Sequence, residues 1–506
     1  MSESLSADTR VLVVGAGIMG AGIAQVAAQA GHRVALFDLR EGAAAAARDK
    51  LGQTLDGLAA KGKLTPEAVQ ATLARIEAIG ALDEARGCGL VVEAIVEHLD
   101  AKRALFRQLE NLLGPDAILA TNTSSISVTA IANGLQRPER LVGMHFFNPV
   151  PLMKLVEVVS GLRTDAAVAA AIFDLSKAWG KVPVHAKSTP GFIVNRIARP
   201  YYAETLALLQ EQAAPPEVLD ACLRAAGFRM GPCELMDLIG HDTNFAVTNS
   251  VYAANFYDKR YVPSLVQQQL VDGGLLGRKS GRGFYAYPDG APALPTPDLP
   301  PLPEDVQPVV HGLGELADTL ATRLPMPHTR QPDSGWVGLS VGAAQLRLTD
   351  GPTAGEIAAG EGLADVAVFD CLPGRAWSGA LALAFADTAG AAWRAQAPAW
   401  LALLGVQPQA VADTPGLVVA RTLAMLVNEA ADAVHQGVCS PEGADAAMKL
   451  GVNYPAGPFE WLAGWSARGV LGILAALDDT YRGERYRASP WLLRRAQRDL
   501  IDGDSA

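Results

Sequence analysis

Residues 10–31 read RVLVVGAGIMGAGIAQVAAQAG, and this stretch decides the fold of the first part of the chain. Val11–Val14 form a mostly β-branched run that is typical of a buried strand, and the apolar residues after Gly20 recur at helical spacing. Between strand and helix, Gly15, Gly17 and Gly20 form a G-x-G-x-x-G pattern. The stretch therefore predicts a strand, a tight turn and a helix whose N-terminal amides favour a pyrophosphate.

Each glycine of this pattern has its own role. Gly15 permits the tight turn, Gly17 lets the backbone approach a phosphate, and Gly20 lets the helix lie close to the sheet. A second strand, Arg33–Phe37, ends at Asp38, 18 residues after Gly20. A carboxylate there would accept hydrogen bonds from an adenosine ribose and repel a 2′-phosphate. The sequence predicts NAD rather than NADP, although the nearby Arg40 could bind a 2′-phosphate, and a turn that serves packing alone is the alternative.

The rest of the chain divides into segments of different character. Short apolar runs between helical segments, typical of a mostly parallel sheet covered on both faces, continue to about residue 187. At Thr189-Pro190-Gly191 the pattern changes, and Thr189 predicts the N-cap of a helix that begins at Pro190 and runs to about Gln212. Eight prolines between residues 288 and 308 predict an extended spacer.

The last hundred residues repeat the first helical segment. Thr414-Pro415-Gly416 matches Thr189-Pro190-Gly191, although Ala420 replaces Asn195. We expect five segments: an α/β Rossmann-type domain over 1–187, an all-α domain over 188–287, the Pro-rich linker 288–308, a small α/β region of unknown role over 309–410 without a phosphate-binding glycine turn, and a second, degenerate copy of the all-α domain over 411–506.

Composition excludes several classes of function. The 506 residues include 42 Lys and Arg against 53 Asp and Glu, a net charge of -11 that would repel a nucleic acid backbone. The five cysteines are scattered, with no CxxC pair or His at metal-ligand spacing, so we expect neither a disulfide framework nor a metal. The polar N-terminus and the lack of a long apolar run predict a cytoplasmic protein that does not enter a membrane.

Polar residues follow three further strand-like runs. Ser124 lies in TNTSS, His145 in HFFNP, and Glu157 on the next run. Ligands gather at strand ends in open α/β sheets. Glu157 could accept from one imidazole nitrogen and leave the other as a base. A core histidine, a helix-capping serine and a solvent-facing glutamate are the alternatives.

These stretches resemble the 3-hydroxyacyl-CoA dehydrogenases. The resemblance covers about residues 1–288 through VLVVGAGIMGAGIAQ, VVEAIVE, TNTSS, RLVGMHFFNPVPLMKLVEVV, STPGFIVNR, GFRMGP and GRKSGRGFY, and residues 411–506 are similar to the helical domain a second time. It implies that His145 is the catalytic base, Glu157 its partner, and Ser124 and Asn195 donors to the substrate. It further implies cofactor contacts at Gly15, Gly17, Ile18, Met19, Gly20, Asp38, Glu97, Lys102, Ser124, Asn148 and Lys279, and CoA contacts at Thr54 and Lys61.

The resemblance implies NAD-dependent oxidation of an L-3-hydroxyacyl-CoA to a 3-oxoacyl-CoA. Members with this tandem layout are similar to bacterial enzymes of phenylacetate breakdown that act on 3-hydroxyadipyl-CoA, and others act on 3-hydroxybutyryl-CoA. Arg196, Arg199 and Arg229 are candidates to bind a dicarboxylic tail. Because the predicted nucleotide-binding strand begins at Val11, we expect no fused hydratase before it.

Two alternatives stay open. One is a dehydrogenase of free hydroxy or sugar acids on the same fold, similar to the gulonate dehydrogenases, and the other is a non-catalytic NAD-binding protein. Single-module members of the family pair through the helical domain. We therefore expect the second copy to pack on the first as a pseudo-dimer within the chain, and we leave a homo-oligomer open. Because Ala420 cannot donate as Asn195 can, the second copy is not expected to form a second active site.

Overall fold

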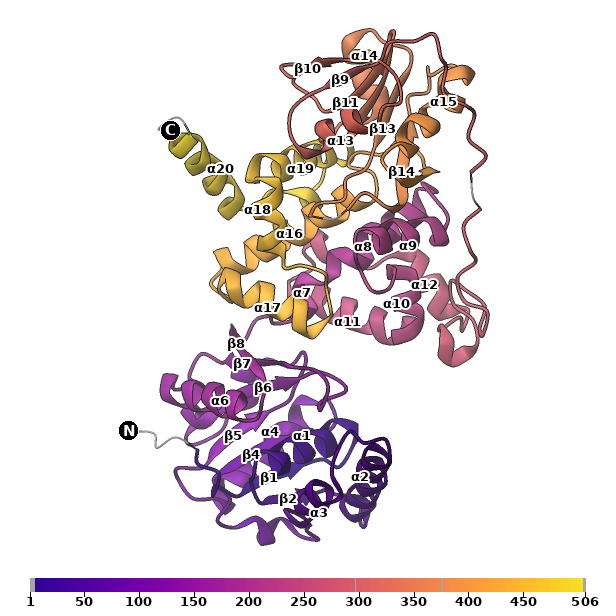
Figure 1. The fold of residues 1–506 in the computed structure, drawn as a ribbon. Coiled ribbons are helices and arrows are strands. Elements are labelled where there is room, and N and C mark those ends of the chain that lie inside the picture. The colour runs from indigo at the N-terminus through magenta and orange to yellow at the C-terminus, as the bar shows by residue number, and fades with distance from the viewer. Residues whose placement is uncertain (1–4, 296, 375, 504–506) are drawn as a thin grey trace. The chain divides into compact units, whose positions relative to one another are not determined.

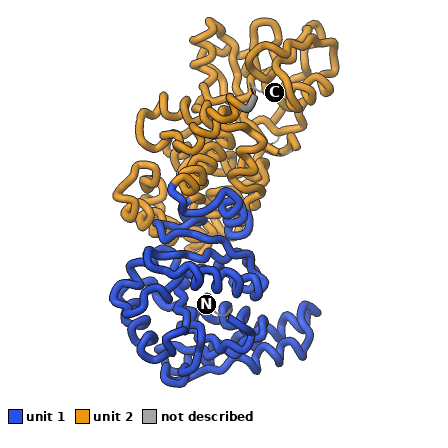
Figure 2. Tube along the Cα trace, turned by 90° about the vertical axis from the view of Figure 1, so that its left-hand side faces the viewer, with its two compact units in different colours: residues 1–196, 436–452 blue, residues 197–435, 453–506 orange. Residues whose placement is uncertain are grey.

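The computed structural model describes residues 5–295, 297–374 and 376–503, which form two compact units. The first unit contains the chain up to Arg196 together with residues 436–452, and the second contains residues 197–435 and the chain from Asn453 onward (Figure 2). A segment of the second helical copy thus belongs to the first unit. No helix among the described residues is both long enough and apolar enough to span a bilayer.

The first unit is built on an eight-stranded sheet with the order β3-β2-β1-β4-β5-β6-β7-β8 (Figure 1). The strands are β1 (Val11–Val14), β2 (Val34–Phe37), β3 (Ile76–Ala78), β4 (Leu90–Glu93), β5 (Ile118–Thr121), β6 (Leu141–Phe146), β7 (Leu155–Ser160) and β8 (Val182–Lys187). All neighbours are parallel except β6 and β7. The strand order reverses at β1 and β4, where such sheets bind dinucleotides.

Helices enclose this sheet because its strands are apolar on both faces. They are α1 (Ile18–Gln29), α2 (Ala43–Ala60), α3 (Pro66–Ala74), α4 (Leu99–Leu112), α5 (Val128–Ala132) and α6 (Ala166–Ala178), with α17 (Pro441–Gly451) added from the second helical copy. The predicted Rossmann-type fold is confirmed.

The second unit contains the other helices of both copies. They are α8 (Arg199–Gln210), α9 (Pro216–Ala225), α10 (Pro232–Ile239), α11 (His241–Ala254) and α12 (Leu265–Asp272) in the first copy, and α16 (Val419–His435), α18 (Pro458–Trp465), α19 (Ala467–Tyr481) and α20 (Pro490–Gly503) in the second. The short α7 (Val194–Ile197) lies at the boundary between the units. Helices α8 and α16 pack together, so the two copies share a buried interface as expected.

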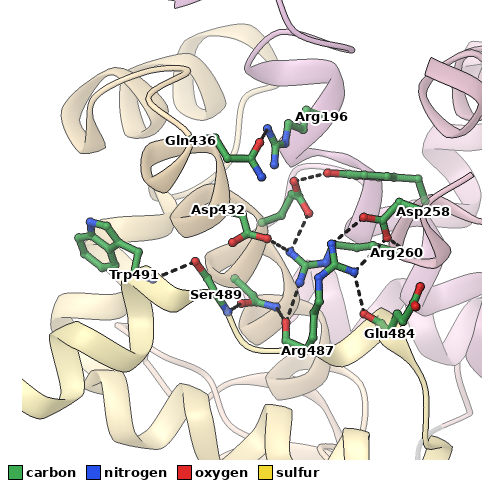
Figure 3. A network of polar contacts seen from close by, with 12 residues as sticks. Arg196, Asp258, Arg260, Asp432, Gln436, Glu484, Arg487, Ser489 and Trp491 are labelled. Atoms are coloured by element: carbon green, nitrogen blue, oxygen red, sulfur yellow. Dashed lines mark hydrogen bonds and ion pairs between the residues drawn. The ribbon is translucent and has the colours of Figure 1, made fainter. Parts of the chain in front are cut away.

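At that interface, each copy contributes a buried glutamate that contacts residues of the other copy. Glu204 on α8 and Arg421 on α16 are fully buried, with Oε2 of Glu204 2.7 Å from Nε of Arg421. At the equivalent place in the other copy, Glu429 accepts from Tyr261, Oε1 to Oη 2.6 Å, and pairs with Arg260. Figure 3 shows the environment of Arg260, which also contacts Asp432. Each copy therefore supplies a glutamate to basic and aromatic residues of the other.

Residues 309–415 of the second unit form a seven-stranded sheet, order β10-β9-β11-β12-β13-β14-β15. Its elements are β9 (Val309–His311), α13 (Glu315–Arg323), β10 (Thr329–Gln331), β11 (Gly338–Val341), β12 (Ala344–Leu348), α14 (Ala354–Glu361), β13 (Val366–Phe369), β14 (Gly379–Phe385), α15 (Ala391–Ala402) and β15 (Val406–Ala410). From β12 to β15 the pairs run parallel, antiparallel and parallel, which repeats β5 to β8.

One prediction about a turn is wrong, and one turn was overlooked. Thr189 does not cap a helix at Pro190: Gly191 and Phe192 have positive φ, of 76° and 47°, and helix begins only at Val194. The small α/β region does contain a glycine turn. Gly312 and Gly314 connect β9 to α13, and β9 and β10 pair in parallel, as β1 and β2 do around α1. Ala317 occupies the position of the third glycine in the G-x-G-x-x-G pattern, so the sequence did not show the full pattern.

Candidate functional site

The glycine turn between β1 and α1 has the geometry that its sequence predicts. Gly15 has φ of +106°, and a Cβ there would lie 2.4 Å from the carbonyl oxygen of Ala94. A Cβ at Gly20 would lie 1.7 Å from the carbonyl oxygen of Gly15, so only glycine lets α1 approach the turn. A Cβ at Gly17 would meet no atom within 4 Å, which leaves open space at the start of the helix. Such a turn fits a pyrophosphate.

Asp38, at the end of β2, is connected to this turn. Its Oδ2 accepts from the backbone N–H of Ala16 at 2.8 Å, and its Oδ1 accepts from the backbone N–H of Arg40 at 3.0 Å. Burial raises the pKa of this carboxyl, but the hydrogen bonds from Ala16 and Arg40 outweigh burial, and the pKa lies below its usual range. A charged carboxylate therefore stands beside the turn, and the Arg40 side chain is paired with it. This arrangement fits the ribose of NAD better than a 2′-phosphate.

Glu97 holds the loop that follows β5. Its Oε1 accepts from the hydroxyl of Thr123 at 2.7 Å and from the backbone N–H groups of Ser124 and Ser125 at 2.9 and 3.1 Å. Burial raises the pKa of Glu97, yet Lys102 and these donors hold it below the usual value. Lys102 is only 1% exposed and lies 3.2 Å from Oε2 of Glu97. Both residues thus position the Ser124 loop, while their predicted cofactor contacts stay predictions.

His145 and Glu157 face each other across the antiparallel pair β6 and β7. Nδ1 of His145 lies 2.6 Å from Oε2 of Glu157, and both side chains are buried. The other carboxylate oxygen of Glu157, Oε1, accepts from the backbone N–H groups of Ile193 and Val194 at 3.0 Å each. The carboxylate therefore fixes the ring on one side and the Thr189–Asn195 turn on the other, which leaves Nε2 as the nitrogen for a substrate.

The turn held by Glu157 brings Asn195 to the same place. Asn195 is in the first turn of α7, not in the second turn of a longer helix, and its Nδ2 lies 3.5 Å from the carbonyl oxygen of Ser124. Ser124 and Asn195 are therefore neighbours, while their predicted contacts with the substrate stay predictions. Asn148 is exposed immediately after β6, and Ile18 and Met19 form the first turn of α1.

Other predicted contacts are not brought to this cluster by any observed interaction. Thr54 and Lys61 are exposed on and after α2, and the Thr54 hydroxyl donates to the carbonyl oxygen of Lys50. Lys279 lies in the second unit, where its Nζ is 2.5 Å from Oδ1 of Asp242. The roles assigned to these three residues remain predictions.

Two supporting residues were missed in the sequence. Glu93, the fully buried last residue of β4, accepts from Lys102 and from the Thr121 hydroxyl at 2.6 and 2.7 Å. Asn122 accepts from the backbone N–H of Phe146 at 2.8 Å and so connects the ends of β5 and β6. An acid inside the apolar run 90–96 was the available signal for Glu93.

Comparisons with known proteins agree with this geometry. The NAD binding domain of 3-hydroxyacyl-CoA dehydrogenases matches residues 10–189, and the C-terminal domain of the same enzymes matches residues 191–287 and 416–503. The chain is 44% identical over 487 residues to the 3-hydroxyadipyl-CoA dehydrogenase of Escherichia coli, which covers 96% of this chain and 97% of that protein. The chain belongs to the 3-hydroxyacyl-CoA dehydrogenase family.

Other members of the family match in whole or in part. A crystal structure of an Escherichia coli 3-hydroxybutyryl-CoA dehydrogenase is 41% identical with a TM-score of 0.89, and the match covers 99% of this chain and 100% of that one. The human mitochondrial hydroxyacyl-coenzyme A dehydrogenase is 41% identical over 284 residues, which are 55% of this chain and 90% of that protein. Residues 346–415 match the reduced Rossmann-fold domain of 3-hydroxybutyryl-CoA dehydrogenase.

The second module of this family member does not repeat the pair of His145 and Glu157. Glu157 and Ala382 occupy equivalent places, because their neighbours on β8 and β15, Val184 and Gln409, each lie five residues before a Thr-Pro-Gly turn. Opposite Ala382, through a backbone hydrogen bond of 3.0 Å, is Asp370. The second module thus has Asp370 and Ala382 where the first has a histidine and a glutamate.

Asp370 makes the same kind of contact with its turn as Glu157 makes with the Thr189–Asn195 turn. Its carboxylate accepts from the backbone N–H groups of Val418, Val419 and Ala420 at 2.9, 2.6 and 2.9 Å, in the turn that matches the one held by Glu157. Complete burial raises the pKa of Asp370 to about 6 despite these donors. The second module thus has a buried carboxylate that holds the turn, with Asp370 where the first module has His145 and Ala420 where it has Asn195.

Proposed function

We propose that this protein oxidises L-3-hydroxyacyl-CoA to 3-oxoacyl-CoA with NAD. The observation that carries the proposal is the buried pair of His145 and Glu157, joined at 2.6 Å, in the same unit as a glycine turn that accommodates a pyrophosphate. NAD, when bound at Gly15, Gly17, Gly20 and Asp38, supplies the acceptor for the hydride.

In this proposal His145 is the base. Oxidation of a secondary alcohol requires loss of the hydroxyl proton, and Nε2 of His145 would accept it because Nδ1 is already engaged by Glu157. The imidazolium that results is stabilised by the Glu157 carboxylate at 2.6 Å. Burial strengthens this attraction, since little water screens the pair.

Ser124 and Asn195 would position and polarise the substrate. Both have side-chain donors, and both are held in place by carboxylates: the loop of Ser124 by the partly exposed Glu97, and the turn that leads into Asn195 by the buried Glu157. Donors fixed in this way stabilise charge that develops on a carbonyl oxygen without having to reorganise. We assign Ser124 and Asn195 to hydrogen bonds with the substrate near its 3-oxygen and its thioester carbonyl.

For the acyl group we propose 3-hydroxyadipyl-CoA, because the relative with that name aligns over both modules. Two arginines considered for its distal carboxylate are engaged with protein groups: Arg196 donates to Gln436 at 2.8 Å and Arg199 to Thr248 at 3.1 Å. Arg229 is exposed. Thr54 and Lys61 remain our candidates for CoA.

The test is a comparison of kcat/KM for 3-hydroxybutyryl-CoA, longer saturated 3-hydroxyacyl-CoAs and 3-hydroxyadipyl-CoA, for the parent and the His145→Gln variant. We expect the highest value for the dicarboxylic substrate, and a loss of about 10²–10⁴-fold in the variant. Turnover of free 3-hydroxy acids without CoA, or equal rates for parent and variant, would contradict the proposal.

A further inference from the structure

We infer that helix α17 of the second helical copy positions the catalytic pair of the first module. The inference rests on the function proposed above. It assigns a role in that site to a segment about 280 residues away in sequence, which has no catalytic side chain of its own. The evidence is a set of contacts within the first unit, to which residues 436–452 belong.

The segment is attached to the sheet at both strands next to the site. Helix α17 packs on β7, which carries Glu157, and on β8, which leads into the turn that carries Asn195. The backbone N–H of Lys187, the last residue of β8, donates to the carbonyl oxygen of Val438 at 2.9 Å. Arg196 donates to Oε1 of Gln436 at 2.8 Å (Figure 3). These bonds fix α17 to the residues on either side of the turn.

The C-terminal end of α17 packs closely against side chains next to the site. Gly451 is the last residue of the helix, and it is buried. A Cβ on Gly451 would lie 2.7 Å from Cδ2 of Leu155, 3.0 Å from Cγ2 of Val194 and 3.6 Å from Cε1 of Phe147. Only a hydrogen at this position lets the helix end approach all three side chains.

Each of these side chains is next to a group that carries the proposed chemistry. Leu155 lies on β7 two residues before Glu157, and the backbone N–H of Val194 donates to Glu157 at 3.0 Å. The ring of Phe147 lies 4.6 Å from the ring of His145, measured between centroids. Displacement of the helix end is therefore transmitted to the carboxylate and to the imidazole at once.

The same helix-to-strand packing occurs in the second module without a catalytic pair beneath it. Helix α9 of the first copy packs on β14, where a Cβ on Gly379 would lie 3.1 Å from Cβ of Ala225. The strand under α9 carries Ala382, and the strand under α17 carries Glu157. The packing is thus a property of both modules, whereas its effect on proton transfer arises only at α17.

The test is a Gly451→Ala variant with a matched Gly464→Ala control. Gly451 has no positive φ, so alanine brings no backbone strain, and a Cβ on Gly464 in α18 would meet nothing within 4 Å. Both variants gain helix propensity, so they differ in the contacts of the added methyl group. Because misplacement of reacting groups by about 1 Å can cost about 10²-fold, we expect kcat of Gly451→Ala to fall about tenfold. The Kd for NADH should stay within about twofold of the parent value, because the glycine turn is untouched.

A second substitution separates positioning from loss of folded protein. Leu155→Val removes the nearest atom, so the Gly451→Ala, Leu155→Val double variant should recover part of kcat. An unchanged kcat in Gly451→Ala, an equal loss in the control, or no recovery in the double variant would overturn the inference. If the parent itself does not oxidise 3-hydroxyacyl-CoA, the proposed function is wrong and the inference falls with it. If the parent turns over, only the inference is at issue.

Discussion

Replacement of Glu157 by glutamine tests the proposed base directly. The carboxylate offers acceptors in two directions: Oε2 toward Nδ1 of His145 at 2.6 Å, and Oε1 toward the N–H groups of Ile193 and Val194 at 3.0 Å each. A glutamine amide has one oxygen and one NH₂ group, so it cannot accept on both sides. The amide oxygen can therefore accept either from the imidazole or from the N–H groups of the turn, but not from both.

The two N–H groups of the turn determine which way the amide is oriented. With the amide oxygen toward the imidazole, the NH₂ group would face two buried N–H donors, and each unsatisfied donor costs about 1–3 kcal/mol. The amide oxygen should therefore face Ile193 and Val194, with the NH₂ group donating to Nδ1 of His145. The ring proton then moves to Nε2, the nitrogen that has to accept the substrate proton.

We expect kcat for oxidation of 3-hydroxybutyryl-CoA to fall by about 10³-fold in Glu157→Gln, which corresponds to about 4 kcal/mol in activation free energy. The free energy of unfolding should change by less than about 1 kcal/mol, because both hydrogen bonds to the turn persist. The measurements are NADH formation, NADH binding by fluorescence, and the imidazole tautomer by ¹⁵N NMR. Glu77→Gln, at a side chain 65% exposed on β3, is the control. A rate within threefold of the parent, or an unprotonated Nε2 in the variant, would refute the reasoning.

Three further predictions concern the turn, the second module and the interface between the copies. Gly17→Ala should melt like the parent but bind NADH at least about tenfold more weakly, whereas Gly20→Ala, whose Cβ would lie 1.7 Å from a backbone oxygen, should lose both stability and binding. Equal melting temperatures for the two variants would contradict this. Because the pKa of Asp370 is raised to about 6 in the folded chain, its ionisation should lower stability as pH rises from about 4 to about 6, by up to about 3 kcal/mol, and thermal melts of Asp370→Asn should lack this part of the parent's pH dependence. Glu204→Gln removes the carboxylate that pairs with the buried Arg421 at 2.7 Å and with Arg485 at 2.8 Å, and leaves Arg421 only Glu211 at 3.6 Å. It should lower the free energy of unfolding by about 3–5 kcal/mol in denaturant titrations, with kcat of the folded enzyme unchanged.

Local patterns predicted the parts of the fold that depend on neighbouring residues. The strand Val11–Val14 has the predicted bounds, because it is a continuous apolar run. The pairing of His145 with Glu157 was also accessible, since twelve residues separate them and the strands that carry them are adjacent.

The error at Thr189 occurred because a distant residue determines the local structure. Thr189 and Pro190 have the sequence of a helix start, but the N–H groups of the first turn are instead satisfied by Glu157, more than thirty residues earlier. The packing of α17 on β7 and β8 could not be predicted from the sequence, because those strands are some 250 residues away in the chain. Periodicity carries no information about contacts of that kind.

The reciprocal contacts of Glu204 with Arg421 and of Glu429 with Tyr261 have a consequence for the evolution of this chain. In an assembly of identical subunits, every substitution at the interface occurs on both sides. Here the two sides are encoded separately, so one can change while the other is kept. Dilution cannot separate the two helical copies either, because they belong to one polypeptide chain. The second half can therefore carry Asp370 and Ala382 where the first half carries His145 and Glu157, without any change in the first half.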